Sequence, residues 1–353
     1  MKAAIVAGNT RLRVTFTSLL SLPARDCRRQ PDTGLLDRGR KKLKLRRKAV
    51  IANPIFRGAS MAQIENILFP VDFSPSCLAM AAYVKRAATL LGAGVSLVHI
   101  VDPGGYNALR TGLELYLLRP MAEVSEEHEA IGRERLDSFL TTDFPTAEYP
   151  RILASGDTAT EIARVAKDGG FNLIIMPTHS GMFRQMLLGS TTAKVLNDAD
   201  CPVLTSRHAE TVAPRPLGHR ELLCAVGLNS DSERVLRFAT GIAREVHAKL
   251  TIIHALQGKA SGLRVELDLE EKVQSVEKRE ALGRIAELQR LVGSDAAVRV
   301  AAGELKKALL EAALLSDADV LIIGRSPRPG ALGRMRDLTY ALIRDSPFPV
   351  LSV

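Results

Sequence analysis

The chain of 353 residues is 46% hydrophobic and 25% charged, which is typical of soluble globular proteins. A single core usually stops growing at about 250 residues, so two domains are allowed, and no apolar run reaches the roughly 20 residues that span a bilayer. The formal net charge is +9, but residues 1–60 hold fifteen Lys and Arg against three Asp and Glu, so the remainder carries −3. The basic character therefore belongs to one segment.

Residues 1–60 form that basic segment, and we expect them to be a disordered N-terminal extension. They include the block Arg38–Lys48, a charge run that could bind polyanions. Met61 directly precedes the first strand-like run, which favours the alternative of an upstream extension that the cell seldom translates. Nucleic-acid binding is the weaker interpretation of this segment.

Four cysteines are scattered without a C-x-x-C pair, so neither a zinc site nor a disulfide framework is predicted. A reducing, cytoplasmic location fits this usage best. Cys77 and Cys201 fall at the start of a predicted helix and a predicted strand, where we expect small buried core residues.

The next segment, beginning at Met61, alternates short apolar runs with helix-like stretches. Uninterrupted runs such as Leu173–Met176 are typical of strands covered on both faces, and the stretches between them are long enough to connect parallel strands. Ser74 and Pro75 supply an N-cap and a first-turn proline, and Gly92 ends that helix. The pattern predicts strands at 64–72, 94–101, 148–154, 172–177 and 202–206, with helices at 75–91, 117–140, 157–168 and 189–199.

The same pattern then occurs a second time. Ile67–Asp72 aligns with Leu222–Gly227 at an offset of 155 residues, and Leu173–Met176 aligns with Val320–Ile323 at an offset of 147. A period this long describes whole domains rather than stacked repeats. The sequence therefore predicts a first domain at 61–207, a linker at 208–219 and a second domain at 220–353.

Each copy is predicted to be a doubly wound α/β domain with a five-stranded parallel sheet. The final strands of the two copies, 202–206 and 349–353, are apolar and are expected at sheet edges that need covering. In such sheets ligands bind beyond the carboxyl ends of the strands. Two loops of the first copy should therefore matter: Pro70–Ser74, and the connection from Met176 to Thr191.

The residues of these loops resemble those of a universal stress protein domain. The likeness rests on Val71–Ser74, Ile175–His179, Leu188–Ser190 and Cys201–Leu204, in that order and spacing. It covers 61–206 and, more weakly, 221–353. The resemblance implies a tandem UspA-like protein whose copies have the Rossmann-like fold of the adenine nucleotide alpha hydrolases and pair through their final strands into a pseudo-dimer.

The same resemblance implies a function in the stress response. It implies a cytoplasmic regulatory protein with unidentified protein partners and no catalytic residues, and at most weak ATP hydrolysis. No membrane partner is expected, and whether whole chains associate further stays open. The alternative is an interaction scaffold that binds no nucleotide.

The resemblance also assigns site residues. Nucleotide-binding members of the family have an aspartate after strand one that contacts adenine, and a G-x2-G-x9-G-[S/T] loop that holds ribose and phosphates. Asp72 matches the first, and Gly189-Ser190 matches the end of the second, whereas Pro177 and Ser180 occupy the first two glycine positions. The expected ligand is ATP or a related adenine nucleotide, with Mg²⁺ only if ATP is bound. The candidate nucleotide-binding residues are Pro70, Val71, Asp72, Ser74, Ile100, Met176, Pro177, Thr178, His179, Ser180, Gly189, Ser190 and Thr191, and no metal ligand is predicted.

Several of these residues have a plain structural alternative. Asp72 could satisfy only the N–H groups of its own turn, and Ser190 and Thr191 could simply cap a helix. His99 and His254 recur at the same place in both copies, which favours a structural role or a pocket wall over catalysis.

The second copy carries weaker signals for a ligand. Gly227 stands where the first copy has Asp72, and Arg336-Asp337 replace Gly189-Ser190, so we expect this copy mainly to complete the fold. Its arginines at 325, 328, 334 and 336 are expected to form a solvated face. The connection at 113–129 of the first copy is expected to be a charged, solvated helix, with a lid as the alternative.

Overall fold

The structure is a computed structural model that describes residues 63–102, 121–178, 188–206, 220–257, 267–325 and 337–353. These residues all belong to one compact unit, Arg57–Val353. The predicted basic extension and the whole of the predicted linker lie outside the described residues, as do His179 and Ser180. No helix in the described part of the chain is long and apolar enough to cross a membrane.

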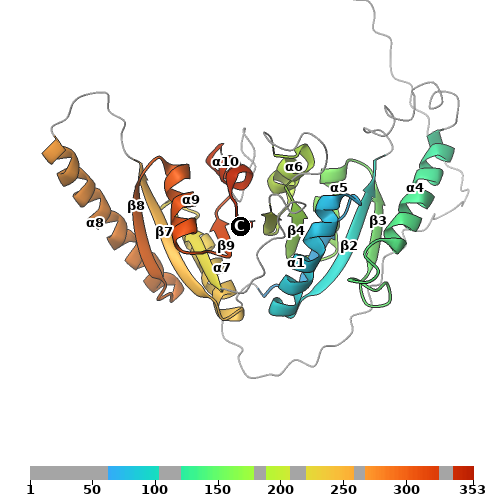
Figure 1. Cartoon of the computed structure of the whole chain (residues 1–353), viewed down its shortest axis with the longest axis horizontal. Helices are drawn as coiled ribbons and strands as arrows, with labels where there is room; N and C mark the ends of the chain where they lie inside the picture. The colour runs from blue at the N-terminus through green and yellow to red at the C-terminus, as the bar shows by residue number, and fades with distance from the viewer. Residues whose placement is uncertain (1–62, 103–120, 179–187, 207–219, 258–266, 326–336) are drawn as a thin grey trace, which may run out of the picture. The chain divides into compact units, whose positions relative to one another are not determined.

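The first copy contains the strands and helices that the sequence predicted, with ends shifted by a few residues (Figure 1, blue to green). Ser74 caps α1 by accepting the N–H of Cys77, and Gly92 ends it in the left-handed conformation with φ 61°. The elements are β1 (Asn66–Pro70), α1 (Pro75–Leu91), β2 (Gly94–Val101), α4 (Met121–Ser138), β3 (Arg151–Ser155), α5 (Thr158–Asp168), β4 (Leu173–Pro177), α6 (Ser190–Asp198) and β5 (Val203–Ser206).

The second copy repeats this order (Figure 1, yellow to red). Its elements are β6 (Glu221–Ala225), α7 (Ser232–Glu245), β7 (Lys249–Gln257), α8 (Leu267–Val292), β8 (Ala297–Gly303), α9 (Leu305–Leu315), β9 (Val320–Ile323), α10 (Asp337–Asp345) and β10 (Val350–Ser352).

The strands of both copies join into one sheet. Its order is β3-β2-β1-β4-β5-β10-β9-β6-β7-β8, and the strands within each copy are parallel. The copies meet where β5 and β10 pair antiparallel, with Leu204 opposite Leu351. The predicted doubly wound domains and their pairing into a pseudo-dimer are confirmed, because each copy's final strand covers the edge of the other.

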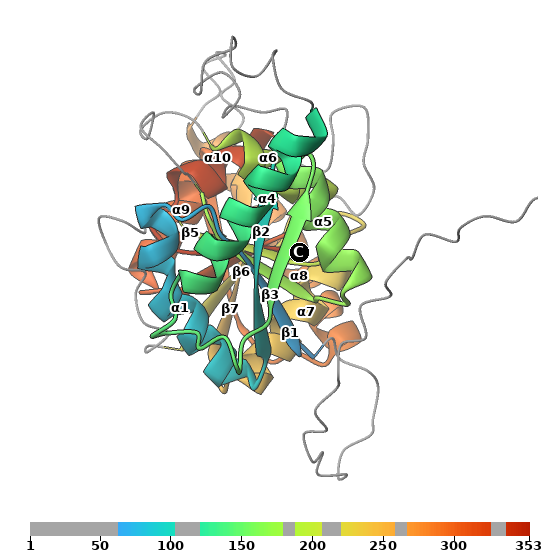
Figure 2. The ribbon, with the colours of Figure 1, turned by 90° about the vertical axis from the view of Figure 1, so that its right-hand side faces the viewer.

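Helices cover both faces of the sheet, and each face has its own apolar core. In the first copy α1 and α4 pack on one face, over residues such as Phe69 and Leu97, whereas α5 and α6 pack on the other, over Val98 and Ile174. Figure 2 shows α4 crossing in front of β2 and β3, the two strands it contacts. Side chains alternate between the faces along each strand, so apolar residues fill both cores without a break.

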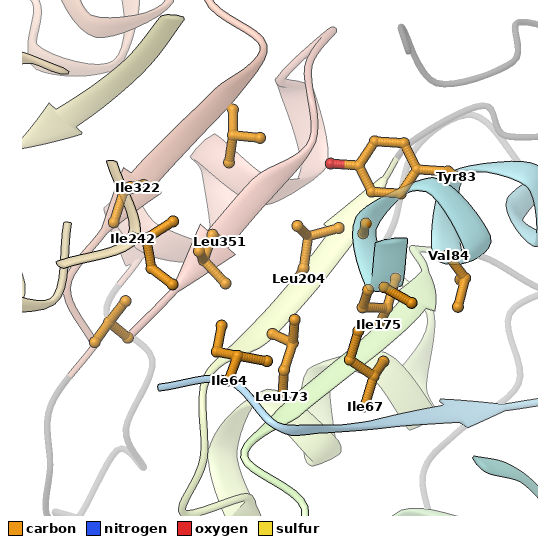
Figure 3. Packing of buried hydrophobic residues seen from close by; sticks show 14 of the residues in the cluster. Ile64, Ile67, Tyr83, Val84, Leu173, Ile175, Leu204, Ile242, Ile322 and Leu351 are labelled. Carbon is orange, nitrogen blue, oxygen red and sulfur yellow. The ribbon is translucent and has the colours of Figure 1, made fainter. Parts of the chain in front are cut away.

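The junction between the copies is apolar. Leu204 and Leu351 lie between Ile64 and Leu173 of the first copy and Ile242 and Ile322 of the second (Figure 3). All six side chains are nearly excluded from water. Burial of this kind contributes about 1.5–3 kcal/mol for each fully buried aliphatic side chain, so the junction is a stabilising core of its own.

A buried arginine also crosses the same junction. Arg325 follows β9 in the second copy and is 5% exposed. Its guanidinium donates to the carbonyls of Leu196 (2.6 Å) and Ala199 (2.8 Å) at the end of α6, and to that of Cys201. The expectation of a solvated arginine was wrong here, because these carbonyls would otherwise lack partners at the helix end and they attract a cation.

Candidate functional site

A cavity of about 590 Å³ lies beyond the carboxyl ends of β1, β2 and β4 in the first copy. The switch point of the fold lies here, because the chain order reverses where β1 pairs with both β2 and β4. The volume falls within the 300–1,000 Å³ that is usual for small-molecule sites. Eight candidate residues line it: Pro70, Val71, Asp72, Ser74, Ile100, Met176, Pro177 and Thr191.

Asp72 sits exposed at this cavity and is fixed by its own turn. Its Oδ1 accepts the backbone N–H of Ser74 at 3.0 Å and the thiol of Cys77 at 3.0 Å. Burial, and then the nearby Asp72 carboxylate, raises the pKa of the Cys77 thiol, so the thiol stays protonated and able to donate. The structural role proposed for Asp72 is therefore present, and Cys77 is a positioning residue as well as a core residue.

Phe73 adopts a strained backbone between these two residues. Its φ is 64°, a left-handed conformation that costs a bulky residue about 1 kcal/mol or more. Its ring compensates through a tilted contact with the His99 ring (4.3 Å between centroids) and an edge-to-face contact with Phe139 (5.2 Å), with the Arg135 guanidinium 4.4 Å from the ring centre. Leu228 occupies the equivalent position in the second copy and is also left-handed, with φ 54°. The loop after the first strand therefore has the same backbone turn in both copies.

His99 forms part of the cavity wall and braces the same loop. Its Nδ1 lies 2.8 Å from the carbonyl oxygen of Val71, and His254 makes the matching contact with Val226, also at 2.8 Å. Burial lowers the pKa of His99, with the nearby Arg135 acting in the same direction, so the neutral ring donates Nδ1–H to this carbonyl. This geometry agrees with the structural role and pocket wall that the sequence favoured.

The lowered pKa of His99 predicts a pH dependence of stability. The unfolded chain takes up this proton near the ordinary pKa of 6.5, before the folded protein does. The contribution of His99 to the free energy of unfolding is therefore complete above 6.5 and is lost as pH falls from there through the lower folded pKa. Urea titrations between about pH 7 and pH 5 should show a shallower decline for His99→Gln than for the wild type, whereas exposed His247→Gln should keep the wild-type decline. Equal slopes for all three proteins would contradict this assignment.

The helix α4 supplies a wall of the cavity that the sequence analysis missed. His128, Ile131, Gly132 and Arg135 line the cavity from this helix. Gly132 allows close approach, because a Cβ there would lie 2.9 Å from Cγ2 of Val101. The four positions follow the pattern i, i+3, i+4 and i+7 of one helical face, so the sequence carried a signal that could have identified this wall. We expected a solvated helix in this connection, but one face of α4 lines the cavity instead.

The amino end of α6 forms the other side of the cavity. Gly189 precedes the helix without a side-chain cap, and Thr191 in its first turn lines the cavity. Free N–H groups of a first helical turn are suited to phosphate oxygens. The hydroxyl of Tyr340 in α10 accepts the N–H of Leu188 at 3.1 Å, so the second copy holds the chain just before this turn.

Three other described candidates do not line the cavity. Thr178 is buried and donates its N–H and its hydroxyl to the carbonyl of Ser206, which ties it to β5. Gly189 donates its N–H to the carbonyl of Thr178 at 3.0 Å, and Ser190 is exposed. Thr178 therefore connects the end of β4 to β5 and does not line the cavity. Among the described residues no group of three His, Cys, Asp or Glu is placed to hold a metal ion.

The second copy has a cavity at the matching place, and its volume is also about 590 Å³. Gly227 and His254 lie where the first copy has Asp72 and His99. The sequence predicted mainly a fold-completing role for this copy. A cavity was not foreseen, because the loss of single ligand-binding residues does not by itself fill the space between a sheet and its helices.

Two parallel-sheet domains, each with a cavity at its switch point, place the chain in the doubly wound α/β class. The model of the universal stress protein family matches residues 63–207 and 218–353. The chain therefore belongs to the universal stress protein family, with two copies of its domain.

Individual relatives agree with this membership. Universal stress protein MJ0577 of Methanocaldococcus jannaschii is 28% identical over 158 residues, which cover 40% of this chain and 93% of the relative. Universal stress protein Rv2623 of Mycobacterium tuberculosis is 26% identical over 196 residues, which cover 54% of this chain and 63% of the relative.

Solved structures show the same fold. The crystal structure of a universal stress protein from Archaeoglobus fulgidus matches with a TM-score of 0.57 and 20% identity, over 82% of this chain and 98% of that chain. A functionally unknown protein, PA1789 from Pseudomonas aeruginosa, matches with a TM-score of 0.54 and 19% identity, over 83% of this chain and 93% of that chain.

Proposed function

We propose that the first copy binds ATP or a related adenine nucleotide, and that binding changes the surface this protein offers to its partners in a stress response. The observation that carries the proposal is the cavity itself, which is lined both by Asp72 and by Thr191 and Thr192 in the first turn of α6. One end offers a carboxylate to the amino group of a base, and the other offers backbone N–H groups to phosphates.

The residues that line the cavity between Asp72 and α6 suit the part of a nucleotide between its base and its phosphates. Val71, Ile100 and Met176 give apolar contact area, and Thr158 and Thr191 add hydroxyl groups at the helix starts. Arg135 and His128 on α4 bring donors to the same space. With no group of described residues placed to hold a metal, Mg²⁺ would be brought by the phosphates of ATP rather than by a protein cage.

Pro177 supports the second candidate function, an interaction scaffold without a nucleotide. It lines the cavity where nucleotide-binding members of the family have a glycine, and it has no N–H to donate. A scaffold would keep the cavity as a by-product of the fold and use its outer surfaces. Both candidates are regulatory, and neither requires a catalytic group.

Calorimetric titration with ATP distinguishes these functions. We expect the wild type to bind ATP, and Asp72→Ala to bind it about tenfold or more weakly, because a hydrogen bond to a charged group is lost. Asp72→Asn should retain the turn through its amide oxygen and fall between the two. Asp231→Ala, which removes a carboxylate at the second cavity, is the matched control and should leave ATP affinity unchanged.

Several results would overturn the proposal. If protein purified from cells releases no nucleotide on heating, and ATP neither binds nor raises the melting temperature, the scaffold is the correct function. Steady phosphate release that disappears in Asp72→Ala would instead show an enzyme.

A further inference from the structure

A small cavity, the junction cavity, lies in the apolar junction between the two copies. Its volume is about 60 Å³, and its lining shares no residue with the cavities at the two switch points. A cavity of about 150 Å³ holds benzene, whereas one water molecule needs roughly 10–15 Å³. The junction cavity is therefore of a size for water and too small for an organic ring.

Two buried polar side chains, one from each copy, interrupt the aliphatic lining of the junction cavity. Tyr83 in α1 is 3% exposed, and Asp319, directly before β9, is 1% exposed. The hydroxyl of Tyr83 and Oδ1 of Asp319 have no hydrogen-bond partner among the residues that the structure describes. Figure 3 shows the hydroxyl of Tyr83 directed from α1 toward the second copy. Arg220 also lines the cavity, but it is exposed and makes no hydrogen bond to Oδ1 of Asp319.

The two atoms are complementary as hydrogen-bonding groups. Burial, and then the charge of Asp319, raises the pKa of the Tyr83 hydroxyl, so the phenol stays protonated and can donate. The carboxylate oxygen can accept. Nearly all buried polar side-chain atoms have a partner in the protein or in ordered water, because an unpaired one lowers stability. A water molecule can accept from the hydroxyl and donate to the carboxylate.

The first copy shows how the position of Asp319 is occupied when every polar atom has a partner within the copy. Asn172 is the equivalent residue there, and its Oδ1 accepts the N–H groups of residues 65 and 66. Its Nδ2 donates to the carbonyl of Gln63 at 2.8 Å. Asp319 retains only the matching contact of Oδ2 with the N–H of Glu221, at 2.9 Å, so its second oxygen is available to the cavity.

The hydroxyl of Tyr83 likewise has no counterpart in the other copy. Phe238 occupies the equivalent position of α7, and neither Phe238 nor Asn172 lines the junction cavity. The phenol and the unpaired carboxylate oxygen therefore occur together on one side of the junction only, and the cavity lies on that side. Because the other side is built without this pair, the fold alone does not account for it.

We propose that the junction cavity is a water-binding site that links the two copies. Ordered water, as one molecule or a short chain, accepts from the hydroxyl of Tyr83 and donates to Oδ1 of Asp319. Helix α1 of the first copy is thereby tied to the start of β9 in the second. The site does not depend on whether the first copy binds a nucleotide.

Replacing Tyr83 by phenylalanine tests the site through the sign of the change in stability. If the hydroxyl binds water, Tyr83→Phe loses that hydrogen bond, and the unfolding constant of the full chain in urea should rise about fivefold or more. If the hydroxyl has no partner, its removal relieves a buried unpaired group. A variant as stable as the wild type, or more stable, therefore overturns the proposal.

Tyr149→Phe is the matched control for this experiment. Tyr149 is partly exposed and does not line the junction cavity, so the loss of its hydroxyl should change the unfolding constant by less than about twofold. Asp319→Asn provides a second comparison, because asparagine can keep the acceptor for the N–H of Glu221 but offers no carboxylate oxygen to water. In that background the effect of Tyr83→Phe on the logarithm of the unfolding constant should fall to about half or less. An undiminished effect overturns the link between the two residues.

Magnetic relaxation dispersion of water nuclei counts the long-lived water molecules of the folded protein directly. The count for the wild-type full chain should exceed that for Tyr83→Phe by at least one molecule, and Tyr149→Phe should match the wild type. Equal counts for the wild type and Tyr83→Phe would overturn the proposal whatever the stability measurements show.

Discussion

Replacing Arg325 by alanine should lower the free energy of unfolding by about 3 kcal/mol. The guanidinium is buried and donates to carbonyls of residues 196, 199 and 201, which lie at the end of α6 and just beyond it. Alanine would leave these acceptors without their donor in a place that water does not easily reach, and it would remove a cation from the negative end of the helix dipole. Urea unfolding of the full chain measures the loss.

Arg237→Ala is the control for that experiment. Arg237 is half-exposed and pairs with Glu233 one turn away at 2.6 Å, so its removal should cost less than about 0.5 kcal/mol. If Arg325→Ala were as mild as Arg237→Ala, the hydrogen bonds across the junction would contribute little, and apolar packing alone would hold the two copies together.

Leu351→Asp should have the largest effect on stability, a loss of more than about 4 kcal/mol. Leu351 is 4% exposed, faces Leu204 across β5 and β10, and packs among the aliphatic residues of the junction (Figure 3). A carboxylate placed here would be buried without a hydrogen-bonding partner. Separation of the copies would then expose two apolar edge strands, so we expect concentration-dependent association as well as lower stability.

Light scattering and thermal unfolding at several protein concentrations test this expectation. Thr205→Val, in the neighbouring position of β5, is the matched control, because the hydroxyl of Thr205 makes one long contact of 3.4 Å with the carbonyl of Val350. It should change stability by less than about 1 kcal/mol and leave the protein unassociated. A Leu351→Asp protein that unfolds like the wild type, without association, would show that the junction is not required.

Much of the fold could be predicted from the sequence, because its signals are local. Uninterrupted apolar runs indicated buried strands, and the pair Ser74-Pro75 located the start of α1. The apolar residues of β5 and β10 indicated edges that must be covered, and those edges cover each other. Only the strand ends were uncertain: the run at 64–72 predicted a longer strand than Asn66–Pro70, since Asp72 and Phe73 form the turn instead.

The role of Arg325 could not be predicted in the same way. Its partners are backbone carbonyls more than a hundred residues earlier in the chain, and a carbonyl has no sequence signature. The second cavity was missed for a related reason. Its volume depends on side chains from several elements of the second copy, whereas motif comparison considers one position at a time. The spacing of the residues on α4 indicated one helical face, but the charged residues of the helix led to the prediction that it is exposed to solvent.

The helix α6 belongs to the first copy but is held in place by residues of the second, so the two copies cannot change in sequence independently. Its amino end borders the first cavity, yet Tyr340 holds Leu188, two residues before the helix, and Arg325 holds its carboxyl end. Both of these residues belong to the second copy. Substitutions of these two residues should shift α6 beside the first cavity without changing any residue that lines that cavity, so the shape of a cavity in the first copy constrains the sequence of the second.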